Sequence, residues 1–273
     1  MCIGVFDSGV GGLSVAGRIL ERMPSERIIY FADNAHVPYG ERPLEEIREF
    51  ALAITEFVVG QGAKAVVMAC NMSSAVALKP AREMYPGVPI IGVINPGARA
   101  AVSQARGKPI GIFATTGTVM SGAYSSVIHT LDSKLQVIEQ PCPEFVPLVE
   151  SGKAETQEAE IAVRKCAKLL IDQNISTLVL GCTHYPFLRE AISSAFGPDV
   201  TLIDPAEETV EELHKLLREE NLLAKESDVM ADHRFFSSGE TDSFAHLGSL
   251  LLGRRIDSVE YATWGVDLGK VLV

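Results

Sequence analysis

Residues 65–71 read Ala-Val-Val-Met-Ala-Cys-Asn, and residues 177–183 repeat this pattern as Thr-Leu-Val-Leu-Gly-Cys-Thr. Each stretch is an apolar run with the length of a β-strand, followed by a small residue, a cysteine and a polar residue that can begin a helix. A chain with two copies of this unit is predicted to hold two domains of similar fold. In open parallel α/β sheets, ligands bind at the carboxyl ends of the strands, where each cysteine is predicted to lie.

The rest of the chain alternates short apolar runs with longer stretches of helical periodicity. Strands are predicted at residues 3–6, 27–32, 64–69, 88–93, 109–114, 135–140, 177–180 and 200–203. Strands that alternate with helices indicate parallel sheets covered on both faces. The predicted fold is therefore α/β, with two domains, each a mostly parallel sheet flanked by helices.

Two loops are predicted to connect the domains. Asn95-Pro96-Gly97 follows the fourth predicted strand, and Asp204-Pro205 follows the last. Pro and Gly interrupt regular structure, which makes these segments suitable crossing points. We predict a first domain made of residues 1–97 and 207–273, and a second domain made of residues 98–206.

The composition limits the classes of function. The chain has 273 residues with 24 Lys and Arg against 35 Asp and Glu, which gives a net charge of −11. An acidic protein repels nucleic-acid phosphates, so no nucleic-acid partner is expected. No apolar run approaches the roughly 18 residues that span a bilayer. Because residues 1–7 also lack the basic and apolar regions of a secretory signal, we expect a cytoplasmic protein without membrane contact.

The five cysteines are predicted to differ in role. An odd count without a close-spaced pair indicates neither a disulfide framework nor a metal site. Cys2, Cys142 and Cys166 are expected to fill space, as buried cysteines often do. Cys70 and Cys182 instead precede predicted helices, where unpaired N–H groups and the helix dipole favour a thiolate. These two are candidate bases or nucleophiles.

Paired cysteines on facing domains suit a reaction that needs similar acid/base groups on both sides of one atom. Inversion at an amino-acid α-carbon is such a reaction, because one thiolate removes a proton and the other thiol delivers one to the far face. Neighbouring residues support this hypothesis. Ser8 and the glycine amides after the first strand can hold a carboxylate, Asp7 can pair with an ammonium group, and His184 can exchange protons with Cys182. The turn that contains Thr115, Thr116 and Thr118 is a second anion-binding candidate.

Other functions remain open at this point. Gly9-x-Gly11 after a strand, with Asp33 about twenty residues on, imitates a dinucleotide fingerprint, but Ser14 stands where the third glycine is needed. A non-catalytic two-lobed ligand-binding protein would not require two matched cysteines. A one-sided lyase or decarboxylase would require only one of them.

The sequence resembles the glutamate racemases of the aspartate/glutamate racemase superfamily over essentially the whole chain. The matching stretches are Val5-Phe-Asp-Ser-Gly-Val-Gly-Gly-Leu-Ser14, Pro38-Tyr-Gly40, Ala69-Cys-Asn71, Pro143-Glu-Phe-Val-Pro-Leu-Val-Glu150 and Leu180-Gly-Cys-Thr-His-Tyr-Pro186. The resemblance implies two pseudo-symmetric α/β domains with the active site between them. It also implies interconversion of L- and D-glutamate without cofactor or metal, supply of D-glutamate for peptidoglycan, and a homodimer.

The resemblance also implies roles for individual residues. Cys70 matches the base that acts on D-glutamate, and Cys182 matches the base that acts on L-glutamate. Groups that assist proton transfer or bind the ammonium are matched by Asp7, Asp33, Glu150 and His184. Substrate contacts are matched by Ser8, Tyr39, Gly40, Asn71, Thr116, Thr118 and Thr183.

One position departs from the family pattern. The usual motif is Cys-Asn-Thr, whereas this chain has Cys70-Asn71-Met72, so a substrate-binding hydroxyl is replaced and the Met72 backbone N–H remains. An aspartate racemase is the alternative within the superfamily. Those enzymes typically have Glu after the second Cys-Thr, and His184 at this position favours glutamate.

Overall fold

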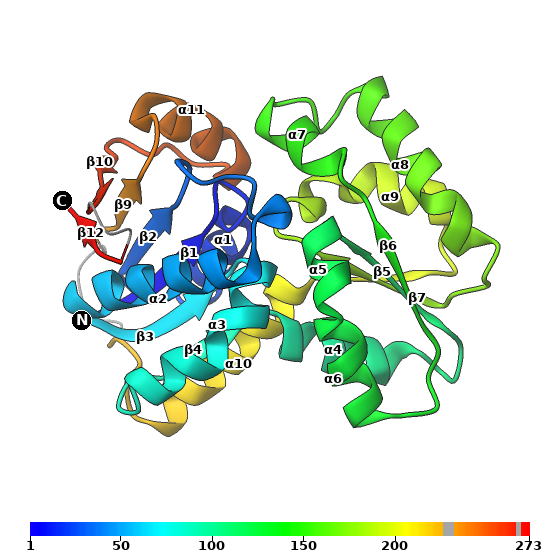
Figure 1. Cartoon of the computed structure of the whole chain (residues 1–273), viewed down its shortest axis with the longest axis horizontal. Helices are drawn as coiled ribbons and strands as arrows, with labels where there is room; N and C mark the ends of the chain where they lie inside the picture. Colours follow the sequence, from blue (N-terminus) through cyan, green and yellow to red (C-terminus); the bar gives the residue numbers. More distant parts are fainter. Residues whose placement is uncertain (226–231, 266–268) are drawn as a thin grey trace.

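The chain forms two parallel β-sheets that lie next to one another, each covered by helices on both faces (Figure 1). This computed structural model describes residues 1–225, 232–265 and 269–273. The predicted α/β fold with two sheet-and-helix units is confirmed.

The first sheet has the strand order β10-β9-β2-β1-β3-β4, and all its neighbouring strands are parallel. Its strands are β1 (Cys2–Asp7), β2 (Ile28–Ala32), β3 (Ala63–Met68), β4 (Ile90–Gly92), β9 (Arg234–Ser237) and β10 (Glu260–Tyr261). One face packs against α1 (Leu13–Arg22), α10 (Pro205–Glu219) and α11 (Thr241–Leu252). The other face packs against α2 (Leu44–Gly60) and α3 (Asn71–Met84). Sequence analysis did not predict β9 and β10, because strands of four and two residues leave no long apolar run.

The second sheet has the strand order β6-β5-β7-β8 and is also parallel. Its strands are β5 (Ile110–Ala114), β6 (Val137–Pro141), β7 (Thr177–Gly181) and β8 (Thr201–Ile203). It is covered by α4 (Ile94–Gln104), α6 (Ala123–Leu131), α7 (Phe145–Glu150), α8 (Gln157–Ile171) and α9 (Arg189–Phe196). The predicted domain boundaries at residues 97 and 207 fall inside α4 and α10, and they stay a prediction.

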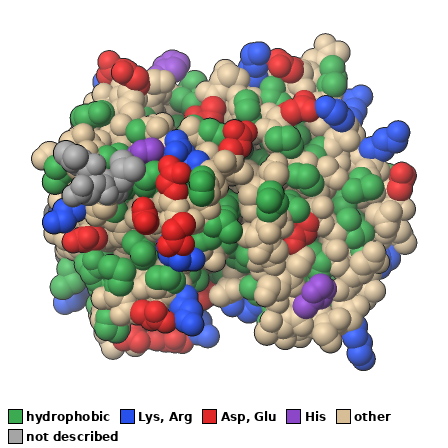
Figure 2. All heavy atoms as spheres, in the orientation of Figure 1, with side chains coloured by type: hydrophobic (Ala, Val, Ile, Leu, Met, Phe, Trp, Pro, Cys, Tyr) green, Lys and Arg blue, Asp and Glu red, His purple; other side chains and the backbone are tan. Residues whose placement is uncertain are grey.

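The remaining elements are short. They are η1 (Tyr39–Glu41), α5 (Thr116–Ser121), η2 (Tyr185–Leu188) and an antiparallel hairpin of β11 (Thr263–Trp264) and β12 (Val271–Leu272). No helix in the described ranges is long and apolar enough to cross a membrane. On the face drawn in Figure 2, acidic and basic side chains are mixed, with hydrophobic side chains between them.

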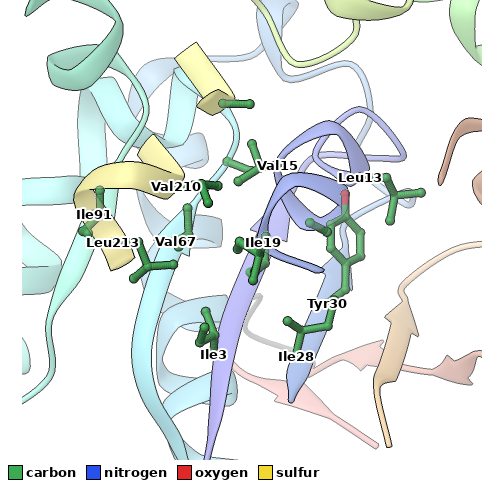
Figure 3. Packing of buried hydrophobic residues seen from close by; sticks show 14 of the residues in the cluster. Ile3, Leu13, Val15, Ile19, Ile28, Tyr30, Val67, Ile91, Val210 and Leu213 are labelled. Atoms are coloured by element: carbon green, nitrogen blue, oxygen red, sulfur yellow. The ribbon is translucent and has the colours of Figure 1, made fainter. Parts of the chain in front are cut away.

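Burial of both faces explains why the central strands β1, β2, β5 and β7 are mostly apolar. Figure 3 shows one layer of this core, where side chains of β1, β2 and β3 meet those of α1 and α10. The labelled members are Ile3, Leu13, Val15, Ile19, Ile28, Tyr30, Val67, Ile91, Val210 and Leu213.

The strand register determines which loops lie together at the edge of the sheet where the strands have their carboxyl ends. In the first sheet Phe6 pairs with Met68, so the chain leaves β1 and β3 at the same edge. In the second sheet Ala114 pairs with both Pro141 and Gly181, so the loops after β5, β6 and β7 also share an edge. The two candidate bases lie on these loops, Cys70 after β3 and Cys182 after β7.

The structure corrects the prediction for two cysteines. Cys142 and Cys166 form a disulfide with their Cα atoms 6.1 Å apart, whereas sequence analysis expected no disulfide. Cys142 follows β6, and Cys166 lies on α8, which packs on the same sheet. The pairing was not visible in the sequence because the partners are 24 residues apart and on different elements. Cys2, Cys70 and Cys182 are free and buried.

Reduction of the Cys142–Cys166 disulfide should lower the free energy of unfolding by about 3 kcal/mol, because a cross-link that closes a loop of this length restricts the unfolded chain by roughly that amount. Urea unfolding with and without a reducing phosphine measures the difference. Cys166→Ser should be insensitive to the phosphine, whereas Cys2→Ala should keep the wild-type response. Equal stability of the wild type under both conditions would contradict the prediction.

Candidate active site

A pocket with about 380 Å³ of empty space, including its open mouth, lies between the two sheets. Both sheets contribute to it from their carboxyl edges. Its lining residues are Ser8, Val37, Pro38, Tyr39, Gly40, Cys70, Asn71, Met72, Thr115, Thr118, Val146, Gly181, Cys182, Thr183 and His184. Two free cysteines, one from each sheet, therefore face the same space.

The local sequence positions each cysteine at the end of a strand. Cys70 lies two residues after β3 and is the N-cap of α3, with an extended backbone. Cys182 directly follows β7 and precedes η2. Because the first amides of a helix have no intrahelical acceptor, those at the start of α3 remain available beside the Cys70 sulfur.

An imidazole and a carboxylate support Cys182 in the second sheet. The Cys182 sulfur lies 3.7 Å from His184 Nδ1, and His184 Nε2 lies 2.7 Å from Glu150 Oε1 at the end of α7. Burial alone would lower the pKa of His184, but its hydrogen bonds and charge interactions with Cys182 and Glu150 raise that pKa well above its usual value. A protonated His184 can donate a hydrogen bond to both partners.

Cys70 has a different environment. Burial and the negative charge of Asp7 raise the pKa of the Cys70 thiol to about 12, although hydrogen bonds from Ser73 act in the opposite direction. A negative charge on Cys182 raises the Cys70 pKa further. The pocket therefore favours a thiol at Cys70 when no substrate is bound, in contrast to the thiolate that its place before a helix predicts.

Asp7 connects the two sheets at the base of the pocket. Its carboxylate accepts from the Gly9 N–H at 3.0 Å and from the Thr183 hydroxyl at 3.1 Å, and Thr183 belongs to the second sheet. Burial raises the pKa of Asp7, while His184 and the backbone N–H groups oppose that shift. A second bond between the sheets joins the Tyr124 hydroxyl to Asn71 Oδ1 at 2.8 Å.

The glycine-rich loop after β1 lets the second sheet come close. A Cβ atom at Gly11 would lie 2.5 Å from both His184 Nδ1 and Thr183 Oγ1, and a Cβ at Gly9 would lie 2.9 Å from Glu150 Oε1. Glycine at position 11 is therefore a packing requirement, whereas at position 9 the flexible end of the Glu150 side chain can move aside. The Gly9 N–H is already bonded to Asp7, which differs from a loop that holds a phosphate.

Comparison with known proteins identifies the family. A family model described as Asp/Glu/Hydantoin racemase matches residues 9–213, which is most of the chain. The chain belongs to this family.

Similar relatives support the assignment over the full length. A glutamate racemase from Desulforudis audaxviator is 43% identical, with 94% of this chain and 96% of the relative aligned. The crystal structure of a glutamate racemase isoform from Bacillus anthracis has a TM-score of 0.91 and 40% identity, covering 98% of each chain. The structure of glutamate racemase from Francisella tularensis in complex with D-glutamate has a TM-score of 0.89 and 34% identity, covering 95% of this chain and 96% of that one.

Most residues that the sequence analysis predicted as substrate contacts line the pocket. One of the predicted threonines does not. Thr118 lines the pocket, but Thr116 is exposed and lies outside the lining, and Thr115 lines the pocket instead. Thr115 is the N-cap of α5, and its hydroxyl accepts from the Thr118 N–H. The predicted turn therefore reaches the pocket through Thr115 and Thr118, and the substrate contact predicted for Thr116 stays a prediction.

The expected residues Asp7, Asp33 and Glu150 lie behind the pocket wall. Asp7 and Glu150 contact lining residues directly, through Thr183 and His184. Asp33 is fully buried and accepts from the Tyr39 hydroxyl at 2.6 Å. Sequence analysis missed Val37, Val146 and Gly181 as lining residues, because apolar side chains and a glycine carry no chemical signal.

Gly11→Ala should reduce racemase activity by about 10² or more in kcat/KM. The added methyl group would displace His184 from Cys182, and a misplacement of about 1 Å in an active site typically has this effect. The measurement is steady-state kinetics, with circular dichroism to confirm the fold.

The matched control is Gly60→Ala. Gly60 is the last residue of α2, and a Cβ there would meet nothing within 4 Å. This variant should keep full activity and gain up to about 1 kcal/mol of stability. Full activity in Gly11→Ala would show that His184 can move without consequence.

Proposed function

We propose that the chain interconverts L- and D-glutamate by proton transfer between the substrate α-carbon and two cysteines, without a cofactor. The observation that carries the proposal is the pair of free cysteines, Cys70 and Cys182, that reach one pocket from opposite sheets. The glutamate racemases to which the chain is similar support the choice of substrate.

The proposed step balances protons and charge. From L-glutamate, the Cys182 thiolate removes the α-proton, and the electron pair left on carbon takes the proton of the Cys70 thiol on the other face. The turnover leaves Cys182 as a thiol and Cys70 as a thiolate, which is the state required for D-glutamate. The thiol at Cys70 and the protonated His184 beside Cys182 match the state required for L-glutamate.

The supporting groups have separate proposed roles. Glu150 holds His184 in its protonated form, and His184 exchanges protons with Cys182. Asp7 provides negative charge for the substrate ammonium group, next to the Cys70 side of the pocket. The resemblance also assigns Asp33 to proton transfer, although its side chain lies behind Tyr39.

The substrate carboxylates are proposed to bind N–H and hydroxyl groups. The amides of Asn71 and Met72 lie in the first turn of α3, where the helix dipole favours anions. The remaining proposed contacts are Ser8, Tyr39, Gly40, Thr116, Thr118, Thr183 and His184, of which only Thr116 lies outside the lining.

Glutamate is preferred over aspartate in this proposal on the ground of His184, whereas Met72 departs from the family pattern. His184 occupies the position where aspartate racemases typically have Glu, and it is bonded to Cys182. Met72 replaces the family threonine, lines the pocket and lies close to Gly117 of the second sheet. The hydroxyl contact is thereby lost, while the backbone N–H of Met72 is retained.

The biological setting is part of the same proposal. We infer that the enzyme acts in the cytoplasm, as a homodimer, and supplies D-glutamate for peptidoglycan. The resemblance to glutamate racemases supports these statements.

Replacement of either proposed base should abolish racemisation. Cys70→Ala removes the proton donor for L-glutamate and Cys182→Ala removes the base, and loss of a positioned acid/base group typically lowers rates by about 10² to 10⁴. Polarimetry of L-glutamate solutions measures the loss. Cys2→Ala, which removes a free buried cysteine from β1, should racemise at the wild-type rate. Near-normal racemisation by Cys182→Ala would refute the two-base proposal.

The same proposal predicts the isotope pattern in D₂O without any mutation. Because each thiol serves one face, the proton removed by Cys182 is not the one delivered by Cys70. With L-glutamate as substrate, the D-product should carry α-deuterium from the first turnovers, and the remaining L-glutamate should stay protiated. Proton NMR after separation of the enantiomers checks both. Early deuterium in recovered L-glutamate would indicate one base, and a requirement for added pyridoxal phosphate or metal would overturn the proposal.

A further inference from the structure

Asp33 is the centre of a buried hydrogen-bond cluster that the proposed reaction does not use. Its carboxylate accepts from the hydroxyls of Tyr39 at 2.6 Å and Ser238 at 2.7 Å, and from the indole N–H of Trp264 at 2.9 Å. The ring Nδ1 of His36 lies 2.9 Å away. A buried carboxylate is stable only when such partners surround it.

The cluster connects distant parts of the chain. Tyr39 and His36 follow β2, Ser238 follows β9, and Trp264 belongs to the hairpin of β11 and β12. Ser238 also accepts from the Ala35 N–H at 3.0 Å, so it holds the same loop a second time. The C-terminal hairpin is thereby attached to the loop after β2.

That loop forms one wall of the pocket. Residues 37–40 all line it, and the Tyr39 side chain is buried. Gly40 faces the second sheet closely, since a Cβ there would lie 3.0 Å from the Thr115 Cβ. Burial and the charge of Asp33 raise the pKa of Tyr39 well above its usual value, so the hydroxyl keeps its proton and its bond to Asp33.

Trp264 also packs against the same region. Its ring lies 5.1 Å from the ring of Phe50 and, edge-on, 5.1 Å from that of His36. It is the only tryptophan in the sequence. It is partly buried against the apolar cluster that contains Tyr39, Cys70 and Met72.

We propose that Trp264 is a positioning residue for the pocket wall at residues 37–40: its indole N–H holds the Asp33 carboxylate, and Asp33 holds the Tyr39 hydroxyl. Asp33 then acts through Tyr39 and does not itself transfer protons. The effect on glutamate turnover rests on the proposed function, whereas the effect on the wall does not.

The first test measures the wall directly. Trp264→Phe keeps an aromatic ring and removes the N–H donor. Hydrogen–deuterium exchange of amides 35–42, read by mass spectrometry on the full chain without substrate, should be about tenfold faster, because a hydrogen bond to a charged group is lost.

The matched control is Thr55→Val. The buried Thr55 hydroxyl donates to the Ala51 carbonyl at 2.7 Å within α2 and has no bond to the Asp33 cluster. Thr55→Val should lower the free energy of unfolding without changing hydrogen–deuterium exchange at residues 35–42. Unchanged exchange in Trp264→Phe, or the same increase in Thr55→Val, would overturn the proposal.

The second test is a double-mutant cycle. Trp264→Phe should raise KM for glutamate about five- to tenfold and leave kcat within about twofold, because the two thiols are not displaced. In a protein that already carries Tyr39→Phe, the Trp264→Phe substitution should change KM by less than about twofold. Both substitutions break the same series of hydrogen bonds from Trp264 through Asp33 to Tyr39. Full additivity would show that Trp264 has only a general structural role. If the wild type does not racemise glutamate, the proposed function fails, and the exchange experiment still decides the positioning role.

Discussion

The site depends on the close approach of two sheets at Gly11. Residue 11 has no space for a side chain, because His184 and Thr183 occupy the position that a Cβ atom would take. This close approach lets Asp7 of the first sheet accept a hydrogen bond from the Thr183 hydroxyl of the second. Without it, Cys70 and Cys182 would belong to separate surfaces, and no single carbon atom could meet both.

The two halves share a backbone pattern but differ in their electrostatics. Cys182 has an imidazole partner that is itself held by Glu150. Cys70 has Asp7 nearby, a negative charge that disfavours the thiolate. Similar strands thus place similar sulfur atoms, and the neighbours of the two sulfur atoms differ: a protonated imidazole lies beside Cys182 and a carboxylate lies near Cys70.

The sequence predicted what is local and failed where partners are distant. Cys70 and Cys182 were predictable because each follows a strand within its own repeated unit. The Cys142–Cys166 disulfide was not, since its partners lie on different elements. The turn that contains Thr115 was found, but a shift of one residue at a helix start decides which side chain faces the pocket. The surroundings of Asp33 involve Ser238 and Trp264, more than 200 residues away, and no local pattern indicates them.

The residues that line the pocket also explain how the binding of an amino acid can favour the thiolate form of Cys70. No Lys or Arg is among the lining residues that the structure describes, so carboxylates must be bound by N–H and hydroxyl groups. In the proposed reaction, the α-ammonium group of an amino acid enters a pocket lined by both sulfur atoms, with Asp7 behind its wall. A positive charge near Cys70 offsets the negative charge of Asp7. It thereby lowers the pKa of the Cys70 thiol from about 12 toward a range in which this thiol can lose its proton and act as a base. In the proposed reaction, the Cys70 thiolate therefore forms when an amino acid is bound, and an empty pocket keeps this thiol protonated and less open to oxidation.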